Sequence, residues 1–107
     1  MTKTRKTTIQ DLIGKRVIIG ITRRTHNEQI VAEEQLHGIV TSMDNVIHVR
    51  LASGKDFTLP PAPETFQRAA PGHYRLRSTG EVVIDPDFTS SWSVIAPKPG
   101  EEQSENI

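Results

Sequence analysis

Residues 73–85 constrain the fold of this chain more than any other segment, because they have the pattern of a complete β-hairpin. Two strand-like stretches flank Ser78-Thr79-Gly80, and a glycine in the third position suits the left-handed backbone of a three-residue hairpin loop. The cross-strand pairs expected from such a loop are Arg77 with Glu81, Leu76 with Val82, Tyr74 with Ile84 and His73 with Asp85. Apolar pairs then lie on one face and polar pairs on the other, which predicts a small antiparallel β fold.

A second loop that ends in glycine, at residues 52–54, has the same form. It predicts Leu51 opposite Lys55 and Val49 opposite Phe57. A two-residue turn at residues 44–45 leads into this hairpin, and the expected pairs across it are Met43 with Val46, Val40 with Val49 and Gly38 with Leu51. In this register one face of the hairpin is the predicted core face, and its residues are Leu36, Val40, Ile47, Val49 and Leu51.

Residues 16–24 and 30–42 are the two longest predicted strands. The first contains an uninterrupted apolar run, Val17-Ile18-Ile19, which is typical of a strand covered on both faces. In the second, Gly38 predicts a bulge or a sharp bend of the kind that curls a sheet. A helix over residues 28–35 is the alternative to a strand in that part of the chain.

A short helical turn is expected at residues 8–13, with Thr8 as its N-cap and Asp11 at its third position. A last strand over residues 91–95 would place Trp92 and Val94 on one face. The pattern as a whole gives six to seven short strands separated by turn signals, with at most short helical turns. We therefore expect an all-β fold, a small antiparallel barrel or sandwich.

Composition divides the chain into a basic segment at residues 1–8, one β-barrel domain at 9–96 and an acidic tail at 97–107. Both end segments are expected to be flexible. No apolar run approaches the about 18 residues that a membrane span requires, so no membrane association is expected. The chain has no cysteine, which favours a reducing, bacterial-type cytoplasm and excludes thiol chemistry.

Charge is distributed unevenly along the chain. Residues 1–24 hold seven basic side chains against one acid, a net charge of +6, whereas residues 25–107 hold six against twelve, a net charge of −6. The basic half suggests a nucleic-acid-binding barrel of Sm-like or OB-like type as one function, and the candidate residues are Lys15, Arg16, Arg23 and Arg24. Few aromatic side chains are left to stack on bases, which weakens this interpretation.

The face of the residue 36–51 ribbon opposite its core is the second candidate surface. It is amphipathic, and its residues are His37, Ile39, Thr41, His48 and Arg50. Such a mixture of aliphatic and polar side chains suits a protein partner or a second copy of the chain. We expect a non-enzymatic binding module that uses this face.

Catalytic and metal-binding motifs are weak. His73 opposite Asp85 resembles a base with its orienting carboxylate, so a hydrolase-like site there is the enzymatic alternative. His37 and His48 share a face, but the predicted register separates them by about 13 Å at ~3.3 Å per residue, too far for one metal ion. We therefore expect no catalytic residue, no metal site and no cofactor.

The stretch 71–83, followed by Asp85-Pro86-Asp87-Phe88 and Trp92, resembles a pattern in small uncharacterised bacterial β-barrel proteins. The order of strands and turns is also similar to that of Sm-like and Tudor-like barrels, at the level of architecture. The resemblance implies a bacterial β-barrel and supplies no catalytic residue. An architectural likeness does not define a function.

Overall fold

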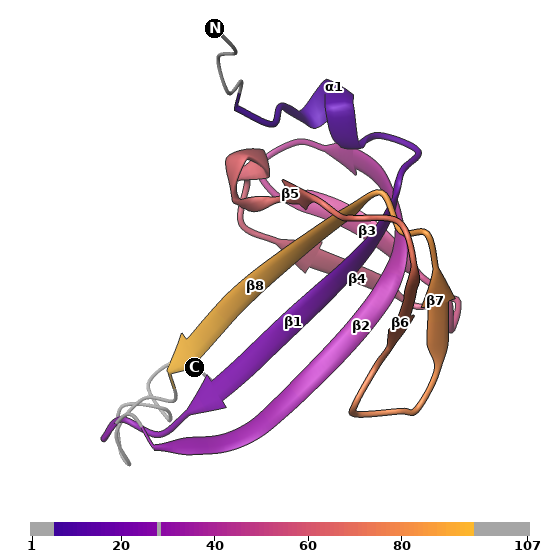
Figure 1. The fold of residues 1–107 in the computed structure, drawn as a ribbon. Helices are drawn as coiled ribbons and strands as arrows, with labels where there is room; N and C mark the ends of the chain where they lie inside the picture. The colour runs from indigo at the N-terminus through magenta and orange to yellow at the C-terminus, as the bar shows by residue number, and fades with distance from the viewer. Residues whose placement is uncertain (1–5, 28, 96–107) are drawn as a thin grey trace, which may run out of the picture.

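The computed structural model of the chain describes residues 6–27 and 29–95, and these are mostly strands. Figure 1 shows the elements in space. In chain order they are α1 (Ile9–Leu12), β1 (Arg16–Arg24), β2 (Ile30–Met43), β3 (Ile47–Leu51), β4 (Asp56–Leu59), a 3-10 turn (Pro63–Thr65), β5 (Gln67–Arg68), β6 (His73–Arg75), β7 (Val82–Ile84) and β8 (Phe88–Ile95).

Six strands form one sheet in the order β4-β3-β2-β1-β8-β5, and β6 and β7 form a separate hairpin. The all-β prediction is confirmed, but the sheet is mixed rather than antiparallel, because β8 runs parallel to β1 from Val17 opposite Phe88 to Arg24 opposite Ile95. Parallel neighbours need a long connection, and the chain from β2 to β7, which lies between β1 and β8, supplies one. The described strands do not close into a barrel, because β4 and β5 are the ends of the sheet order.

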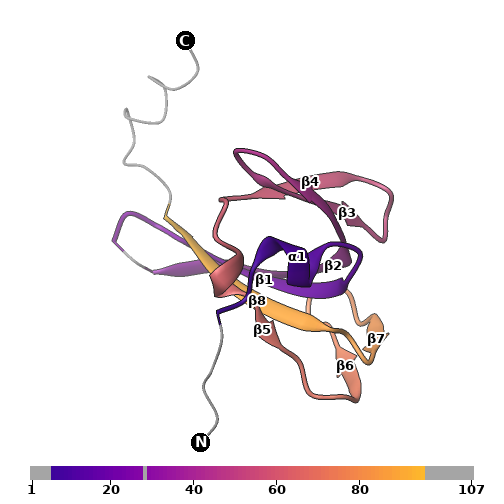
Figure 2. The ribbon, with the colours of Figure 1, turned by 90° about the horizontal axis from the view of Figure 1, so that it is seen from above.

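Strand β1 is buried on both faces, as its apolar run predicts. Figure 2 shows β3 and β4 on one side of β1 and β8, and the β6–β7 hairpin on the other. Val17 and Ile19 belong to the main core, which the curled sheet encloses together with Phe66 and Phe88. Ile18 points the other way and packs in a smaller core that the hairpin covers. Burial on both sides makes β1 the centre of the fold.

The predicted starts of two elements are confirmed. Strand β1 spans Arg16–Arg24, and in α1 the backbone N–H of Thr8 donates to Oδ2 of Asp11 at 2.9 Å. The last strand is longer than predicted and begins at Phe88.

The alternative of a helix over residues 28–35 is wrong, because β2 begins at Ile30 and pairs with β1. Just before β2, Oγ1 of Thr25 accepts from the backbone N–H of Asn27 and of Gln29.

The β3–β4 hairpin has the predicted register, with Val49 opposite Phe57. The β2–β3 hairpin agrees in part. Gly38 lies opposite Leu51 and Val40 opposite Val49, but Met43 lies opposite Ile47 instead of Val46. The reason is a bulge between Val40 and Ser42, which adds one residue to β2 and lengthens the turn.

The predicted register of the β6–β7 hairpin is wrong by one residue. Tyr74 lies opposite Val83, and His73 lies opposite Ile84 rather than Asp85. The loop has four residues, because the backbone N–H of Gly80 donates to the carbonyl of Leu76 at 2.7 Å. A one-residue slip reverses the faces of a strand. Tyr74 and Leu76 stay on the core side as predicted, but on β7 the core residue is Val83, 3% exposed, and Val82 is exposed.

Gly38 lies at no bulge, so of the two predicted roles the bulge is wrong and the bend remains. A Cβ at this position would lie 2.2 Å from the carbonyl oxygen of Arg50, which no side chain tolerates. The glycine therefore permits a close approach of β2 to β3 where the sheet curls.

Two end segments, 1–8 and 97–107, were predicted to be flexible. Residues 1–5 of the first and all of the second lie outside the described residues. Within the described part, Oγ1 of Thr7 donates to the carbonyl of Phe66 at 2.9 Å. None of the described helices has the length and apolar character needed to cross a bilayer.

Candidate protein-binding groove

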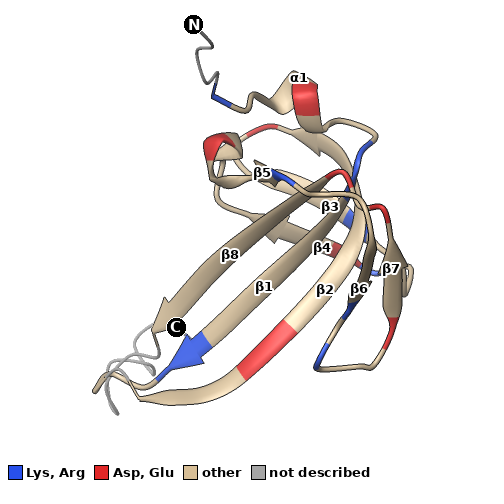
Figure 3. Cartoon of the chain, in the orientation of Figure 1, with Lys and Arg blue, Asp and Glu red and all other residues tan. Residues whose placement is uncertain are grey.

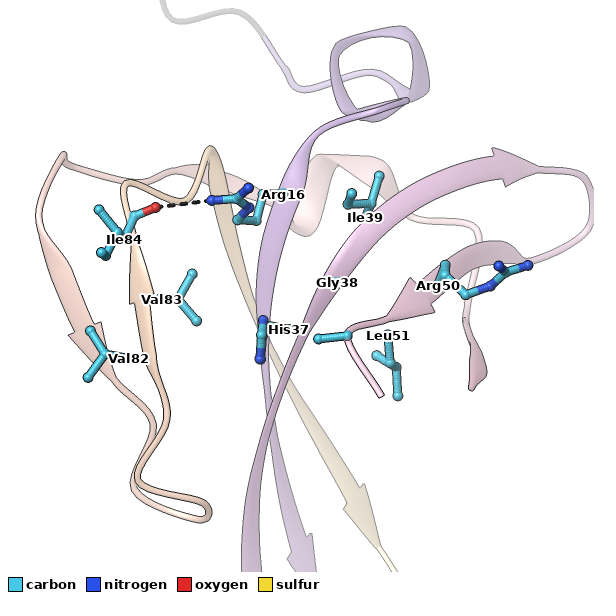
Figure 4. A pocket seen from close by; sticks show the side chains of 10 residues that line it. Arg16, His37, Gly38, Ile39, Arg50, Leu51, Val82, Val83 and Ile84 are labelled. Carbon is cyan, nitrogen blue, oxygen red and sulfur yellow. Dashed lines mark hydrogen bonds between the residues drawn. The ribbon is translucent and has the colours of Figure 1, made fainter. Parts of the chain in front are cut away.

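An open groove of about 470 Å³ lies between the β2–β3 ribbon and β7. Figure 4 shows Ile39 on one wall and strand β7 on the other, with the Val83 side chain directed toward His37 and those of Val82 and Ile84 on the opposite side of β7. The aliphatic side chains of Ile39, Val82 and Ile84 are 45%, 46% and 51% exposed. Apolar side chains of this size, gathered around one concave surface, are typical of a binding site.

The two walls belong to independent parts of the fold. One wall follows from Gly38, because the close approach of β2 and β3 turns the ribbon where Ile39 and Arg50 pair. The other wall is the β6–β7 hairpin, which is held against β1 by Leu76 and Val83 packing on Ile18. The register of that hairpin turns the Val82 and Ile84 side chains away from the small core and onto the exposed face of the hairpin.

The two arginines at the borders of the groove already have partners. Nη1 of Arg16 donates to the carbonyl of Ile84 at 3.3 Å and joins β1 to the hairpin. Nε of Arg50 lies 2.6 Å from Oδ1 of Asp56. The groove is therefore bordered by cations whose hydrogen bonds or charges are engaged, and its open surface is mainly aliphatic.

His37 and Glu81 form a second link between the walls. Nε2 of His37 lies 3.4 Å from Oε2 of Glu81. Contact with His37, and then with the Thr79 hydroxyl, holds the pKa of Glu81 below its ordinary value. The link fastens the loop end of the hairpin to β2.

The structure brings together three of the five residues predicted for the protein-binding face: His37, Ile39 and Arg50 line the groove. Thr41 and His48 lie nearer the β2–β3 turn, where Oγ1 of Thr41 donates to the carbonyl of His48 at 3.3 Å.

The His48 ring lies 3.1 Å from both carboxylate oxygens of Asp44. The backbone N–H of Val46 and the His48 ring both lower the pKa of Asp44. The bulge places His48 opposite Ser42 rather than Thr41. Of the predicted face, His37, Ile39 and Arg50 therefore belong to the groove, and Thr41 and His48 to the turn end of the ribbon.

The groove also uses Arg16, Val82 and Ile84, which sequence reasoning did not assign to it. The two aliphatic residues were expected in the core from the three-residue loop. The structure instead closes a four-residue loop, in which the backbone N–H of Leu76 donates to the carbonyl of Glu81 and that of Gly80 to the carbonyl of Leu76. The strand pattern alone could not select between the two hairpin registers, because all three residues of β7 are apolar.

The four basic residues proposed for nucleic acid lie at opposite ends of β1 (Figure 3). Arg16 and Arg24 are eight residues apart, or about 26 Å at ~3.3 Å per residue. Nε of Arg23 is 2.9 Å from Oε1 of Glu34, which offsets its charge. The fold therefore separates these residues into two small groups.

In the hydrolase-like alternative, Asp85 would orient His73, but the structure places Asp85 in a turn with Gly72. The backbone N–H of Asp85 donates to the carbonyl of Gly72, and Oδ1 of Asp85 accepts from the backbone N–H of Gly72 at 2.7 Å. Asp85 has a positive φ of 51°, and His73 lies opposite Ile84. Within residues 6–27 and 29–95, no three His, Asp or Glu side chains are grouped so that they could hold a metal ion.

Comparison of the chain with protein-family models, with curated proteins and with solved structures found no match. The site is therefore interpreted from its own geometry.

Proposed function

We propose that this protein is a non-enzymatic β module that binds a segment of a protein partner in the groove between β2–β3 and β7. The observation that carries the proposal is that three exposed aliphatic residues, Ile39, Val82 and Ile84, are among those that line the groove or form its rim. Covering these side chains would remove apolar area from water, which is the main favourable contribution to most protein association.

The chemistry of the groove favours an apolar anchor on the partner. Arg50 is paired with Asp56 and Arg16 with a backbone carbonyl, so neither is free of a competing interaction. A charged ligand would compete with these contacts for the two guanidinium groups, whereas an aliphatic or aromatic side chain would only displace water. A partner segment with one or two large apolar residues and few charges therefore fits best.

Nucleic-acid binding has less support. The basic residues are divided between the two ends of β1, and Arg23 is paired with Glu34. A backbone-tracking surface needs cations along a continuous path.

The proposal can be tested by selecting peptides from a random display library on the folded protein. NMR shifts of the Ile and Val methyl groups then locate the bound peptide. We expect shifts at Ile39, Val82 and Ile84, and we expect Ile39→Asp to raise Kd by about tenfold or more, since a charge would be buried at the contact.

The matched control is Val31→Asp, which introduces the same charge at an exposed aliphatic position on β2 outside the groove. It should leave the affinity unchanged. The proposal fails if the selected peptides shift methyl groups elsewhere, if both variants weaken binding equally, or if no peptide is selected.

A further inference from the structure

Among the described residues, the outer edge of β8 has no strand partner along most of its length. Strand β5 pairs only with Phe88 and Thr89, and Oγ1 of Thr65 lies 3.3 Å from Oγ of Ser90. Beyond that point, residues 91–95 pair with β1 on one side and with no described strand on the other. Figure 1 shows this part of β8 extending away from β5. Unpaired backbone groups on such an edge are a template for another strand.

The open edge lacks the usual protection against strand pairing. Phe88–Ile95 contains no charged residue and no proline, although charges and prolines are the common means of blocking an edge. The other long open edge, the first half of β2, differs because it carries Glu33 and Glu34. The two edges are therefore not equivalent, and β8 is the one suited to pairing.

Apolar side chains accompany the open edge. Val94 and Ile95 are 44% and 56% exposed. Trp92 is partly buried and packs against the main core. A strand added to this edge would cover aliphatic surface as well as backbone groups.

From these observations we propose that β8 pairs antiparallel with β8 of a second copy of this chain, about a two-fold axis at Ser93. The open segment has five residues, so Ser93 is its centre. In this register Trp92 lies opposite Val94 of the partner subunit and Ser91 lies opposite Ile95 of the partner subunit. The six-stranded sheet then continues across the axis. This inference goes beyond the proposed function, because it uses a different surface from the groove.

A second copy fits this edge better than a charged partner does. Two-fold pairing places each residue near its own counterpart, so a charged strand repels itself. The same operation on β2 would bring the Glu33 and Glu34 carboxylates of the two copies together. On β8 it brings together serines and an aromatic–aliphatic pair, and such cross-strand pairs are favourable.

The test is sedimentation equilibrium of the full chain over a wide range of concentrations. We expect the mass to rise with concentration from 11.9 kDa to twice that value. Ser93→Lys places two ammonium groups next to each other at the axis and should raise the dimer Kd on the order of tenfold or more. Ser42→Lys is the matched control, because Ser42 is an exposed strand residue away from β8, and this variant should dimerise like the wild type.

Backbone amide exchange provides a measurement that needs no variant. Amides within residues 91–95 should become more protected as the concentration rises, while those of residues 30–34 on the β2 edge should not. The inference is overturned if the wild type stays at 11.9 kDa throughout or if the two lysine variants dimerise equally. Dissociation by Ile39→Asp but not by Ser93→Lys would also overturn it, and would place self-association in the groove.

Discussion

The β3–β4 and β6–β7 hairpins have loops of the same apparent type, yet only one has the register that its loop predicts. Strand β3 alternates apolar and polar residues from Ile47 to Leu51, so a slip of one residue would expose its core face. Strand β7 is Val82-Val83-Ile84, and both of its faces are apolar. Local pattern thus determines register in the first hairpin. In the second, the contacts with β1 and β2 determine it.

The largest expected effect tests the junction of the first hairpin with β2. Gly38→Ala should destabilise the fold by about 3 kcal/mol or more, because its Cβ would overlap the backbone at Arg50. Denaturant unfolding measures this change. Gly20→Ala is the control, since the nearest atom to its Cβ is 3.8 Å away, and it should cost less than about 1 kcal/mol. Equal effects would mean that β2 and β3 do not approach as closely as described.

A pair of neighbouring substitutions tests the register of the second hairpin directly. Val83→Ala should cost about 2 kcal/mol, because Val83 packs on Ile18 and Leu76. Val82→Ala should change stability by no more than about 0.5 kcal/mol, because that side chain is exposed. The register predicted from a three-residue loop buries Val82 instead, so it requires the larger loss of stability in Val82→Ala. That result would show that the three-residue-loop register is the correct one.

A smaller effect concerns the contact that fastens the second hairpin to β2. The side-chain oxygen of Gln35 accepts from the backbone N–H of Arg77, and the Ser78 hydroxyl bonds the Gln35 backbone. Gln35→Ala should cost about 1 kcal/mol and speed exchange of the Arg77 amide. Gln67→Ala, at an exposed position on β5, is the control. If the Arg77 amide exchanges at the same rate in both variants, the contact does not hold the loop.

The smallest effect is a pH dependence of the same attachment. The pKa of Glu81 is lowered below 4.5 by contact with His37 and Thr79. A carboxyl with a depressed pKa in the folded state adds stability above its unfolded pKa, and this is lost as the pH falls through the folded value. The Glu81→Gln variant should therefore lose less stability than the wild type as the pH falls below 4.5. Denaturant midpoints measured over a pH series give this dependence. The exposed Glu64→Gln is the control, and an unchanged slope in Glu81→Gln would exclude the link.

The candidate site was predictable only in part, for the same reason as the register. Ile39 and Arg50 face outward in the alternation of the β2–β3 ribbon, and the structure places both at the groove. Val82 and Ile84 could not be assigned to the groove, because every residue of β7 is apolar and the sequence therefore does not indicate which face is buried. The bulge at Thr41 likewise left no clear local signal, so His48 was expected opposite Thr41, whereas it lies opposite Ser42.

Some features of the fold could be predicted from the amino-acid sequence, because their signals lie within a few neighbouring residues. These are the extent and two-sided burial of β1, the Thr8–Asp11 start of α1 and the register of β3–β4, each of which depends on alternation, capping or a loop glycine within a few residues. The tertiary structure alone decided the parallel pairing of β1 with β8, the register of β6–β7 and hence the groove. The physical reason is that packing of Ile18 on Leu76 and Val83 joins segments more than 50 residues apart, and no local pattern contains that contact.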